Sequence, residues 1–464
     1  MIDSLKPYAA MKDSGVEWLG RVPAHWKIRR LKYVLRECDI RSVNGCEQLL
    51  RVSQYTGVTQ RLPTGSTEWP DTRADSLIGY KRAEPNNLVV NIMLAWNGSM
   101  GVSQFYGIVS PAYCVYRFFD DISPWYFHYL LRSPKLKSRI RSVSTGVVES
   151  RLRLYTDDLY RLEAIVPPLP EQAAIARFLD HVNDQIDRYI SAKEKLIALL
   201  AEQKQAIIHE AVTGRIDVRT SRPYAACKPS GIEWLGDVPA HWSITRIKVE
   251  FNCLNRCRLP LSSTERGSIT LREYDYYGAS GVIDKVDDYL FDDDLILIAE
   301  DGANLVLRNL PLVIVARGKY WVNNHAHILR PKHGNLEYLA NLLECFDYLP
   351  WISGAAQPKL TQDRLMSIVI AVPPREEQDK IASYISADTA HLRAASTRAQ
   401  DEIDLLREYR TRLIADVVTG KLDVRSVAVE LPAAERVAED ERGDAVSGET
   451  GFCMEEHKAQ EDSR

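Results

Sequence analysis

The chain carries the same segments twice. YAAMKDSGVEWLGRVPAHWKIRRLK covers residues 8–32 and YAACKPSGIEWLGDVPAHWSITRIK covers residues 224–248, with 18 of 25 positions identical. VPPLPEQAAIA from Val166 matches VPPREEQDKIA from Val372, and VTGRIDVR from Val212 matches VTGKLDVR from Val418. The offset is 216 for the opening pair and 206 for the closing pairs. Each half therefore consists of a shared opening, a variable middle and a shared closing segment.

Length and composition fit a chain of several domains. A single core seldom grows beyond ~250–300 residues, and this chain has 464, of which 45% are hydrophobic and 26% charged. No uncharged apolar run reaches ~18 residues, and the first residues lack the apolar core of a secretory signal. The eight cysteines show no regular pairing, which suits a reducing compartment. We expect a cytoplasmic protein.

The closing segments predict two long helices. Prolines and Glu171 mark the start of the first, Gly214 marks its end, and 47 residues separate Pro167 from Gly214 as they separate Pro373 from Gly420. Residues recur at alternating spacings of four and three, as in a coiled-coil seam. The first seam comprises Ile175, Leu179, Val182, Ile186, Tyr189, Lys193, Leu196, Leu200, Gln203 and Ile207, and the second Ile381, Ile385, Asp388, Leu392, Ala395, Ala399, Glu402, Leu406, Tyr409 and Leu413.

Equal helices in two similar halves favour antiparallel docking with pseudo-two-fold symmetry. The alternative is that each helix packs only on its own half, as an amphipathic bundle helix. At ~1.5 Å per residue, a helix of about 40 residues spans ~60 Å.

The two middles predict α/β domains with irregular antiparallel sheets. Short β-like runs at 88–94, 112–118, 295–299 and 312–316 alternate with Gly, Pro and Asn turns. The first middle, residues 21–165, holds 21 Lys/Arg against 13 Asp/Glu, a net of +8. The second, residues 237–371, holds 14 against 17, a net of −3. The net charge of −4 for the whole chain thus hides a basic first middle.

Amide, basic and aromatic side chains in both middles are candidates for contact with DNA, because they read base edges or contact phosphates. An equally plausible reading is that they are strand-edge aromatics and turn amides. The candidates in the first middle are Gln54, Tyr55, Lys81, Arg82, Trp96, Asn97, Lys137, Arg139, Arg141 and Arg153. Those in the second are Tyr274, Tyr276, Tyr277, Ser280, Lys319, Trp321, Asn323, Asn324, Gln357 and Lys359.

Arg153 and Lys359 correspond through the offset of 206, and each follows a loop of small residues. A cation at the same place in both halves suits a phosphate contact. The alternative is a solvated surface charge.

Catalytic signatures are missing. There is no GxxxxGK[ST] loop, and no glycine-rich turn of the kind that would bind S-adenosylmethionine. Zinc held by Cys253, Cys257, His325 and His327 is a weak possibility, since the first half has no equivalent. Magnesium on the acids of 292–294, Glu300 and Asp301 would suit a nuclease, although such runs are more often solvated turns. We predict no metal and no catalytic residue.

GVEWLGRVPAHW and GIEWLGDVPAHW, the two VPPxxEQ segments and the twin helices together resemble the specificity subunit of type I restriction-modification enzymes, over nearly the whole chain to about residue 425. The resemblance implies two target recognition domains, residues 1–165 and 220–371, and two conserved spacer helices, 166–219 and 372–425. Such a subunit is non-catalytic and reads a bipartite, asymmetric target on double-stranded DNA.

The resemblance also implies partners. Two methylation subunits would use S-adenosylmethionine to methylate adenine N6, and two restriction subunits would use ATP and Mg²⁺ to cleave DNA. Residues 426–464 depart from the family pattern, with 4 basic and 11 acidic residues typical of a disordered tail. A two-headed coiled-coil scaffold that binds proteins is the alternative function.

Overall fold

The computed structural model describes residues 5–61, 74, 76–148, 151–233, 235–354 and 358–432. The chain divides into two compact units: a first unit of residues 1–191 and 403–464, and a second unit of residues 192–402. Within the described residues, no helix is long and apolar enough to cross a membrane.

The first unit is built on a four-stranded antiparallel sheet. Its strand order is β4 (Leu35–Cys38), β11 (Tyr113–Phe118), β8 (Leu88–Asn91) and β9 (Met100–Val102). β8 is buried along its whole length, as expected of an apolar run in the middle of a sheet. The predicted run of 88–94 ends early, because the Asn91 side chain accepts a hydrogen bond from Met93 N and turns the chain.

The second unit repeats this sheet. The order is β16 (Phe251–Cys253), β23 (Ala326–Pro331), β20 (Leu295–Ala299) and β21 (Val313–Ala316), again antiparallel throughout. Each middle thus contains its own copy of the same sheet, and this repetition is not visible in the sequence. The predicted class of two similar α/β domains is confirmed.

Smaller shared elements surround each sheet. In the first unit they are β1 (Met11–Asp13), β2 (Arg21–Pro23), β3 (Lys27–Arg30), β12 (Glu163–Val166), α1 (Pro124–Arg132), α3 (Thr156–Arg161) and η2 (Leu31–Tyr33). Their counterparts are β13 (Cys227–Pro229), β14 (Asp237–Pro239), β15 (Ser243–Arg246), β24 (Val369–Val372), α8 (Leu336–Glu344), α9 (Gln362–Ser367) and α5 (Ile247–Glu250). The pairings β1·β2, β13·β14, β12·β3 and β15·β24 correspond in both units.

The remaining strands correspond as well. In the first unit β5 (Leu50–Ser53) pairs with β6 (Gly57–Gln60), β10 (Gly107–Val109) pairs with β7 (Lys81–Ala83), and a parallel bridge from Leu49 to Ile108 links the two pairs. The second unit has the same arrangement in one sheet, ordered β18 (Gly281–Val286), β17 (Tyr274–Gly278), β22 (Lys319–Val322) and β19 (Phe291–Asp292). The further short elements are η3 (Ala95–Asn97), α2 (Pro134–Val143) and α11 (Arg425–Ala428) in the first unit, and η5 (Asn255–Cys257), α6 (Ser263–Ser268), α7 (Asn304–Leu307) and η6 (Leu349–Trp351) in the second.

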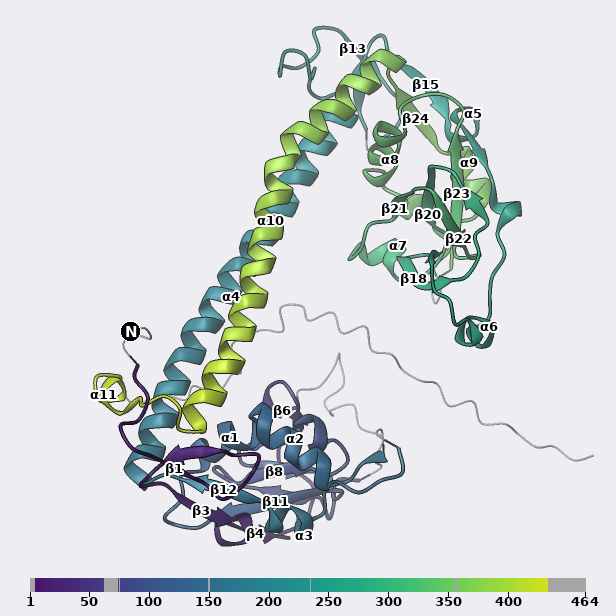
Figure 1. Cartoon of the computed structure of the whole chain (residues 1–464). Helices are drawn as coiled ribbons and strands as arrows, with labels where there is room; N and C mark the ends of the chain where they lie inside the picture. The colour runs from purple at the N-terminus through teal and green to yellow at the C-terminus, as the bar shows by residue number, and fades with distance from the viewer. Residues whose placement is uncertain are drawn as a thin grey trace, which may run out of the picture. The chain divides into compact units, whose positions relative to one another are not determined.

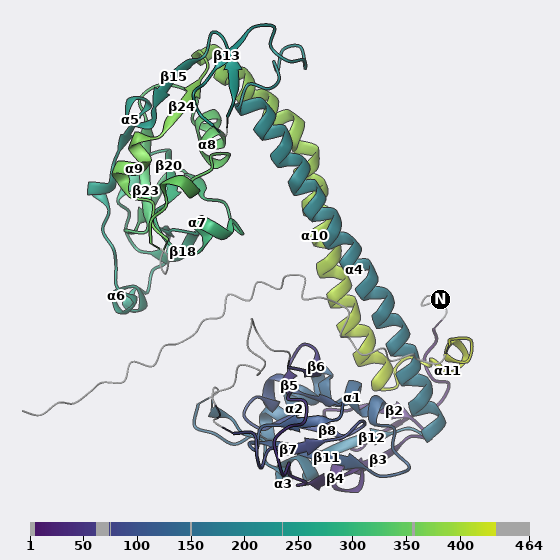
Figure 2. The same ribbon diagram turned by 180° about the vertical axis from the view of Figure 1, so that it is seen from behind.

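Two helices of 44 residues each, α4 (Leu169–Val212) and α10 (Arg375–Val418), pack together antiparallel. Figures 1 and 2 show teal α4 and yellow-green α10 side by side. Lys193 pairs with Glu402 at 2.6 Å, and Asp187 pairs with Arg410. The residue numbers of the two pairs change in opposite directions, as antiparallel packing requires. The predicted antiparallel helix pair is therefore confirmed, and the alternative of separate bundle helices is wrong.

The less exposed face of each helix repeats every 3.6 residues on average, because ten intervals cover 36 residues. In α4 this face comprises Ile175, Leu179, Val182, Ile186, Ile190, Lys193, Ile197, Leu200, Lys204, Ile208 and Ala211. In α10 it comprises Ile381, Ile385, Thr389, Leu392, Ser396, Ala399, Ile403, Leu406, Arg410, Leu413 and Val417. A straight helix drifts by ~20° per heptad from a 3.5-residue repeat. The helices follow the straight-helix period.

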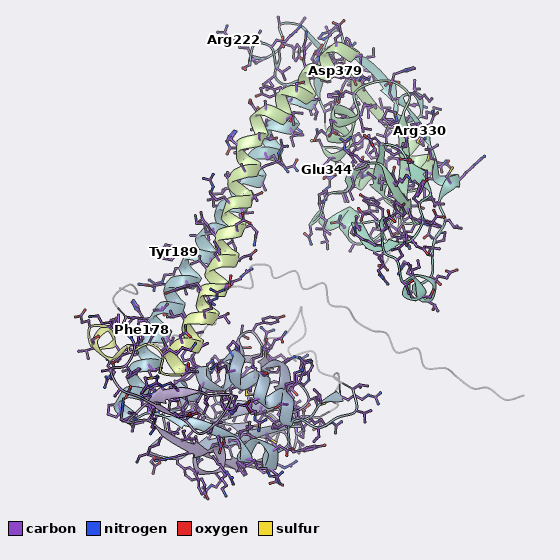
Figure 3. The ribbon with its side chains drawn as sticks, in the orientation of Figure 1. Phe178, Tyr189, Arg222, Arg330, Glu344 and Asp379 are labelled. Carbon is purple, nitrogen blue, oxygen red and sulfur yellow. The ribbon has the colours of Figure 1, made fainter. Side chains whose placement is uncertain are left out.

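The structure consequently differs from the predicted heptad seam in the middle of both helices. Tyr189, labelled in Figure 3, is 63% exposed, and Leu196 is 40% exposed. Ile190 is buried and Ile197 is half-buried in their place. Of the predicted seam residues, Ile175, Leu179, Val182, Ile186, Ile381, Ile385, Leu392, Ala399 and Leu413 are buried, whereas Leu200, Ile207 and Leu406 are half-buried.

A buried carboxylate at the start of each long helix explains the shared opening motif. Glu171 accepts hydrogen bonds from Tyr8 Oη at 2.5 Å and Trp26 Nε1 at 3.0 Å, and His25 Nε2 lies 2.8 Å away. We call Tyr8, His25, Trp26 and Glu171 the first carboxylate cluster.

Tyr224, His241, Trp242 and Glu377 form the second carboxylate cluster, with distances of 2.5, 2.6 and 3.1 Å to Glu377. Burial opposes ionisation of Glu377, but the hydrogen bonds from Tyr224, His241 and Trp242 outweigh it and lower the pKa of this carboxyl.

The far end of each long helix packs on the opening motif of the other half. Gly420, after α10, has φ of 73°, and an added Cβ would lie 2.4 Å from Pro23 Cδ and 3.0 Å from the Trp26 ring. Gly214, after α4, has the same φ and approaches Pro239 and Trp242 equally closely. The glycines of the two VTG segments are therefore required twice, for the left-handed backbone and for the close approach.

We predict that Gly420→Ala destabilises the first unit more than Gly15→Ala does. Both positions have positive φ, so each alanine should cost ~1–2 kcal/mol of folding free energy. Only Gly420 adds an overlap with Pro23 and Trp26, because nothing lies within 4 Å of a Cβ at Gly15. Overpacking should add roughly 1–3 kcal/mol. Hydrogen exchange of the first-unit sheet would measure the difference, and equal effects would contradict the packing argument.

We further predict that Glu171→Ala loosens the first unit and leaves the second unchanged. The substitution leaves the Tyr8 hydroxyl and the Trp26 indole N–H without their acceptor. This should lower the free energy of unfolding by roughly 2–5 kcal/mol in total. Amide exchange should accelerate in residues 8–31 and 163–175 but not in 224–247. Glu377→Ala is the matched control and should show the reverse. Acceleration in both units from either variant would show that the two clusters are not local.

Candidate nucleic-acid interface

In the first unit, the turn between β5 and β6 carries two of the candidate residues. Arg132, at the end of α1, donates hydrogen bonds to the carbonyl oxygens of Gln54 at 3.0 Å and Tyr55 at 2.5 Å. A Cβ at Gly57 would lie 2.4 Å from Arg132 Nη1, so a larger residue there would displace this guanidinium. The Tyr55 side chain is 69% exposed, and the Gln54 side chain is half-buried. Arg132 thus holds the backbone of the turn while Tyr55 faces solvent.

The connection between β8 and β9 holds two more candidates against α2. Trp96 Nε1 donates to Met93 O at 3.1 Å, and Asn97 Oδ1 accepts from Ser99 N and Ser99 Oγ. The Arg141 guanidinium lies 5.8 Å from the centre of the Trp96 ring, a cation–π contact. The candidates Gln54, Tyr55, Trp96, Asn97, Lys137, Arg139 and Arg141 therefore lie on three connected segments.

Lys137 lies along Gly98, where an added Cβ would come within 3.1 Å of its side chain. Burial, and then the charge of Arg132, lower the pKa of the Lys137 ammonium.

Arg153 and Lys359 occupy the same backbone position in the two units. Arg153 forms paired backbone hydrogen bonds with Thr145 at 2.8 and 3.0 Å, and Lys359 forms the same pair with Ser353 at 2.8 and 2.9 Å. Each bridge closes a loop, and the next residue binds the end of the central strand: Leu154 N to Ile92 O and Leu360 N to Glu300 O. The correspondence deduced from the sequence offset thus has the same geometry in both units.

The side chains at these two positions differ in their surroundings. Lys359 Nζ lies 3.2 Å from Glu300, a buried carboxylate that also pairs with Arg258. Arg153 is exposed, and among the residues the structure describes no acid pairs with it. This arrangement favours different roles for Arg153 and Lys359.

Lys81 and Arg82 lie apart from the other candidates. β7 pairs with β10, and Lys81 is buried with Glu37 at 3.7 Å and Asp39 at 3.8 Å. The Arg82 guanidinium lies 5.2 Å from the centre of the Tyr106 ring. Their sequence signal, two adjacent cations, does not distinguish a surface contact from a buried pair.

In the second unit, the candidates other than Gln357 and Lys359 belong to β17, β22 and the turns that follow them. β17 carries Tyr274, Tyr276 and Tyr277, and it runs parallel to β22, which carries Lys319 and Trp321. Ser280 and Asn324 are exposed, and Lys319 lies 4.5 Å from the centre of the Tyr289 ring.

Several of these side chains have structural partners. Tyr276 is buried and its hydroxyl accepts from Leu261 N at 2.9 Å, while Trp321 Nε1 donates to Leu259 O at 2.6 Å. Tyr277 packs edge-on against Tyr320, and buried Asn323 accepts from His325 N at 2.8 Å. Gln357 lies outside the described residues.

Several of the acids and soft ligands considered for metals have other partners. Asp293 pairs with Arg330, Asp294 with Arg317, and Asp301 with His325. His327 is fully buried between Asn255 and the Leu360 carbonyl, and burial lowers its pKa. Across the described residues, no three His, Cys, Asp or Glu side chains gather in a way that could hold a metal ion.

Two cations beside the candidates were missed by the sequence analysis, namely Arg132, which holds the β5–β6 turn, and Lys135 on α2. The available signal was the sequence itself, which contains no acidic residue between Asp121 and Glu149.

Comparison with known proteins gives concordant matches. The family model of the type I restriction modification DNA specificity domain matches residues 247–403. A putative type I restriction enzyme specificity subunit of Haemophilus influenzae is 35% identical over 140 residues, which cover 30% of this chain and 35% of that protein. The match thus spans about a third of that relative.

A putative type I restriction enzyme specificity subunit, MjaX, of Methanocaldococcus jannaschii is 23% identical over 319 residues, which cover 66% of this chain and 70% of that protein. Among solved structures, one from work on complex assembly and conformational transition of the type I R-M system has a TM-score of 0.55 at 14% identity. The alignment covers 86% of this chain and 98% of that one, which shows a shared fold.

Proposed function

We propose that this chain, which belongs to the family of type I restriction-modification specificity subunits, reads a bipartite, asymmetric target on double-stranded DNA. Specificity subunits of this kind are non-catalytic. The observation that carries the proposal is the duplication of one scaffold, sheet and carboxylate cluster alike, with different side chains presented in each copy. Two related but unlike surfaces suit two unlike half-sites.

Residues 1–165 and 220–371 are proposed as the two target recognition domains. Residues 166–219 and 372–425 would be the conserved spacer helices, and no function is assigned to the acidic residues 426–464. In the first domain we favour Gln54, Tyr55, Trp96, Asn97 and α2 as the DNA-contacting set, because the structure places them on adjoining segments. In the second we favour the exposed Ser280, Lys319 and Asn324.

The partners follow from the same proposal. The chain would direct two methylation subunits, which use S-adenosylmethionine to methylate adenine N6, and two restriction subunits, which use ATP and Mg²⁺ to cleave DNA. A complex that acts on the DNA of a cell would work in the cytoplasm. The matched proteins give no support to the alternative of a protein-binding scaffold.

The helix pair suits the role of a molecular ruler. Each helix of 44 residues has a fixed length, about 66 Å at 1.5 Å per residue. Base pairs that face the same side of B-DNA lie one helical turn apart, which is ~34 Å. A spacer of constant length would therefore set a constant number of unread base pairs.

We predict that lengthening both helices in step lengthens the unread spacer. Residues 185–206 and 391–412 correspond by the offset of 206 and contain the ion pairs Lys193–Glu402 and Asp187–Arg410. Duplicating both segments adds 22 residues per helix, about 33 Å, which is close to one turn of B-DNA. Sequencing of the methylated motif should show about ten additional unread base pairs between unchanged half-sites.

The control duplicates residues 185–206 alone, which leaves α4 without a matching partner and should abolish specific methylation. An unchanged spacer in the doubly lengthened chain would contradict the ruler role.

We also predict that Arg153→Ala and Lys359→Ala differ in their effect. Arg153→Ala should weaken binding to all sequences alike and flatten the slope of log K against log salt by about one, as for one lost phosphate contact. Lys359→Ala should change the slope less, because this cation already neutralises Glu300. Binding titrations at several salt concentrations would measure both slopes. Equal slope changes would show that Lys359 also contacts phosphate.

A further inference from the structure

Helix α2 of the first unit is a cationic segment without acidic neighbours in sequence. It carries Lys135, Lys137, Arg139 and Arg141, and Arg132 lies just before it. From Ile122 to Val148 the chain contains no Asp or Glu. The concentration of positive charge supplies much of the net +8 of the first middle.

The helix presents its cations in two rows. Leu136 and Ile140 are buried and fix the inward face. At 100° per residue, Lys135 and Arg139 lie on one side of this face and Lys137 and Arg141 on the other. Exposed Ser138 and Ser142 lie between the rows on the outward face. The Ser142 hydroxyl donates to Arg139 O at 2.8 Å, so Ser138 is the residue that supplies a hydroxyl donor between the cations, of the kind that proteins use to bind phosphate oxygens.

Three of these cations have no carboxylate partner in the part of the chain that the structure describes. They are Lys135, Lys137 and Arg139. The Arg139 guanidinium donates to the Ser142 hydroxyl at 3.2 Å. Cations grouped in this way repel one another, which destabilises the folded state. A bound polyanion would reduce this repulsion.

The helix is also tied to the two turns that carry the other candidates. Arg141 lies over Trp96, and Lys137 lies along Gly98. Arg132 holds the turn of Gln54 and Tyr55. A ligand bound on α2 would therefore have beside it the exposed Tyr55 side chain and the half-buried Gln54, Trp96 and Asn97 side chains.

Among its described residues, the second unit has no counterpart of this helix. After α8 the chain forms the short η6, with Phe346 and Tyr348 buried. From Gly334 to Pro358 the sequence contains no Lys or Arg. The basic α2 and the uncharged η6 segment follow corresponding helices, α1 and α8. At this position, therefore, only the first unit offers cations to a polyanion.

We propose that α2 is a clamp for the DNA sugar-phosphate backbone that the first target recognition domain possesses and the second lacks. The inference rests on the proposed function and deepens it. The row of Lys135 and Arg139 and the row of Lys137 and Arg141 contact phosphates, with the Ser138 hydroxyl as a donor between them. The first half-site is then held largely by salt-dependent contacts, and the second by contacts to base edges.

The test measures the salt dependence of cognate DNA binding by the full chain with its methylation subunit. The Lys135→Gln, Arg139→Gln double variant changes two exposed side chains. Its slope of log K against log salt should be shallower by about two, at ~0.9 per phosphate contact. Affinity should fall for cognate and unrelated DNA alike, and the methylated motif should stay the same.

The matched control is Lys32→Gln with Arg161→Gln, which removes the same charge from exposed positions on η2 and α3 of the same unit. Its slope should match the wild type within about half a unit. The charge-conserving Lys135→Arg, Arg139→Lys variant should retain the wild-type slope. Equal loss of slope in the glutamine variant and the control would overturn the proposal, because overall charge would then explain the effect.

An unchanged slope in the glutamine variant would also overturn the proposal. So would a glutamine variant that keeps its DNA affinity but loses the methylation subunit, because α2 would then contact a protein partner. Failure of the proposed function is distinguishable. In that case the wild-type complex would show no preference for any sequence, whereas failure of this inference alone leaves specific binding intact and its salt slope indifferent to α2.

Discussion

Each unit depends on one buried carboxylate with three donors. Glu171 and Glu377 stand in the first turn of their helices, where the positive end of the helix dipole favours a negative charge. A tyrosine, a histidine and a tryptophan from the opening motif direct their polar atoms at that charge. A buried charge is tolerated only with such partners, so the contact fixes the opening segment against the helix.

Sequence reasoning was successful wherever a pattern was local or repeated. The duplicated motifs indicated two similar α/β units, and the proline and glycine signals indicated two long helices, which end at Val212 and Val418, just before Gly214 and Gly420. It failed where neighbours in space decide. The inward positions of Ile190 rather than Tyr189, and of Thr389 rather than Asp388, follow from the straight-helix period, which a heptad template does not contain.

The candidate interface was predictable in composition but not in arrangement. Lys81 and Arg153 look alike in the sequence, yet one is buried beside Glu37 and Asp39 and the other is exposed. Tyr276 and Trp321 resemble base-stacking residues but bond to neighbouring backbone. The acid-free stretch around α2 was visible in the sequence; its two cationic rows became apparent only once Leu136 and Ile140 fixed the inward face.

The end of α10 completes the first unit, because Gly420 packs on Trp26 and Tyr126 Oη bonds to Val418 O at 3.1 Å. The first unit is thus made from two distant stretches of chain, whereas the second is one continuous stretch. Since synthesis proceeds from the N-terminus, the second unit has all its residues before the first does. The first unit begins to leave the ribosome before the second but is completed after it. Until residues 418–420 have been synthesised, the side of Trp26 that contacts Gly420 remains uncovered.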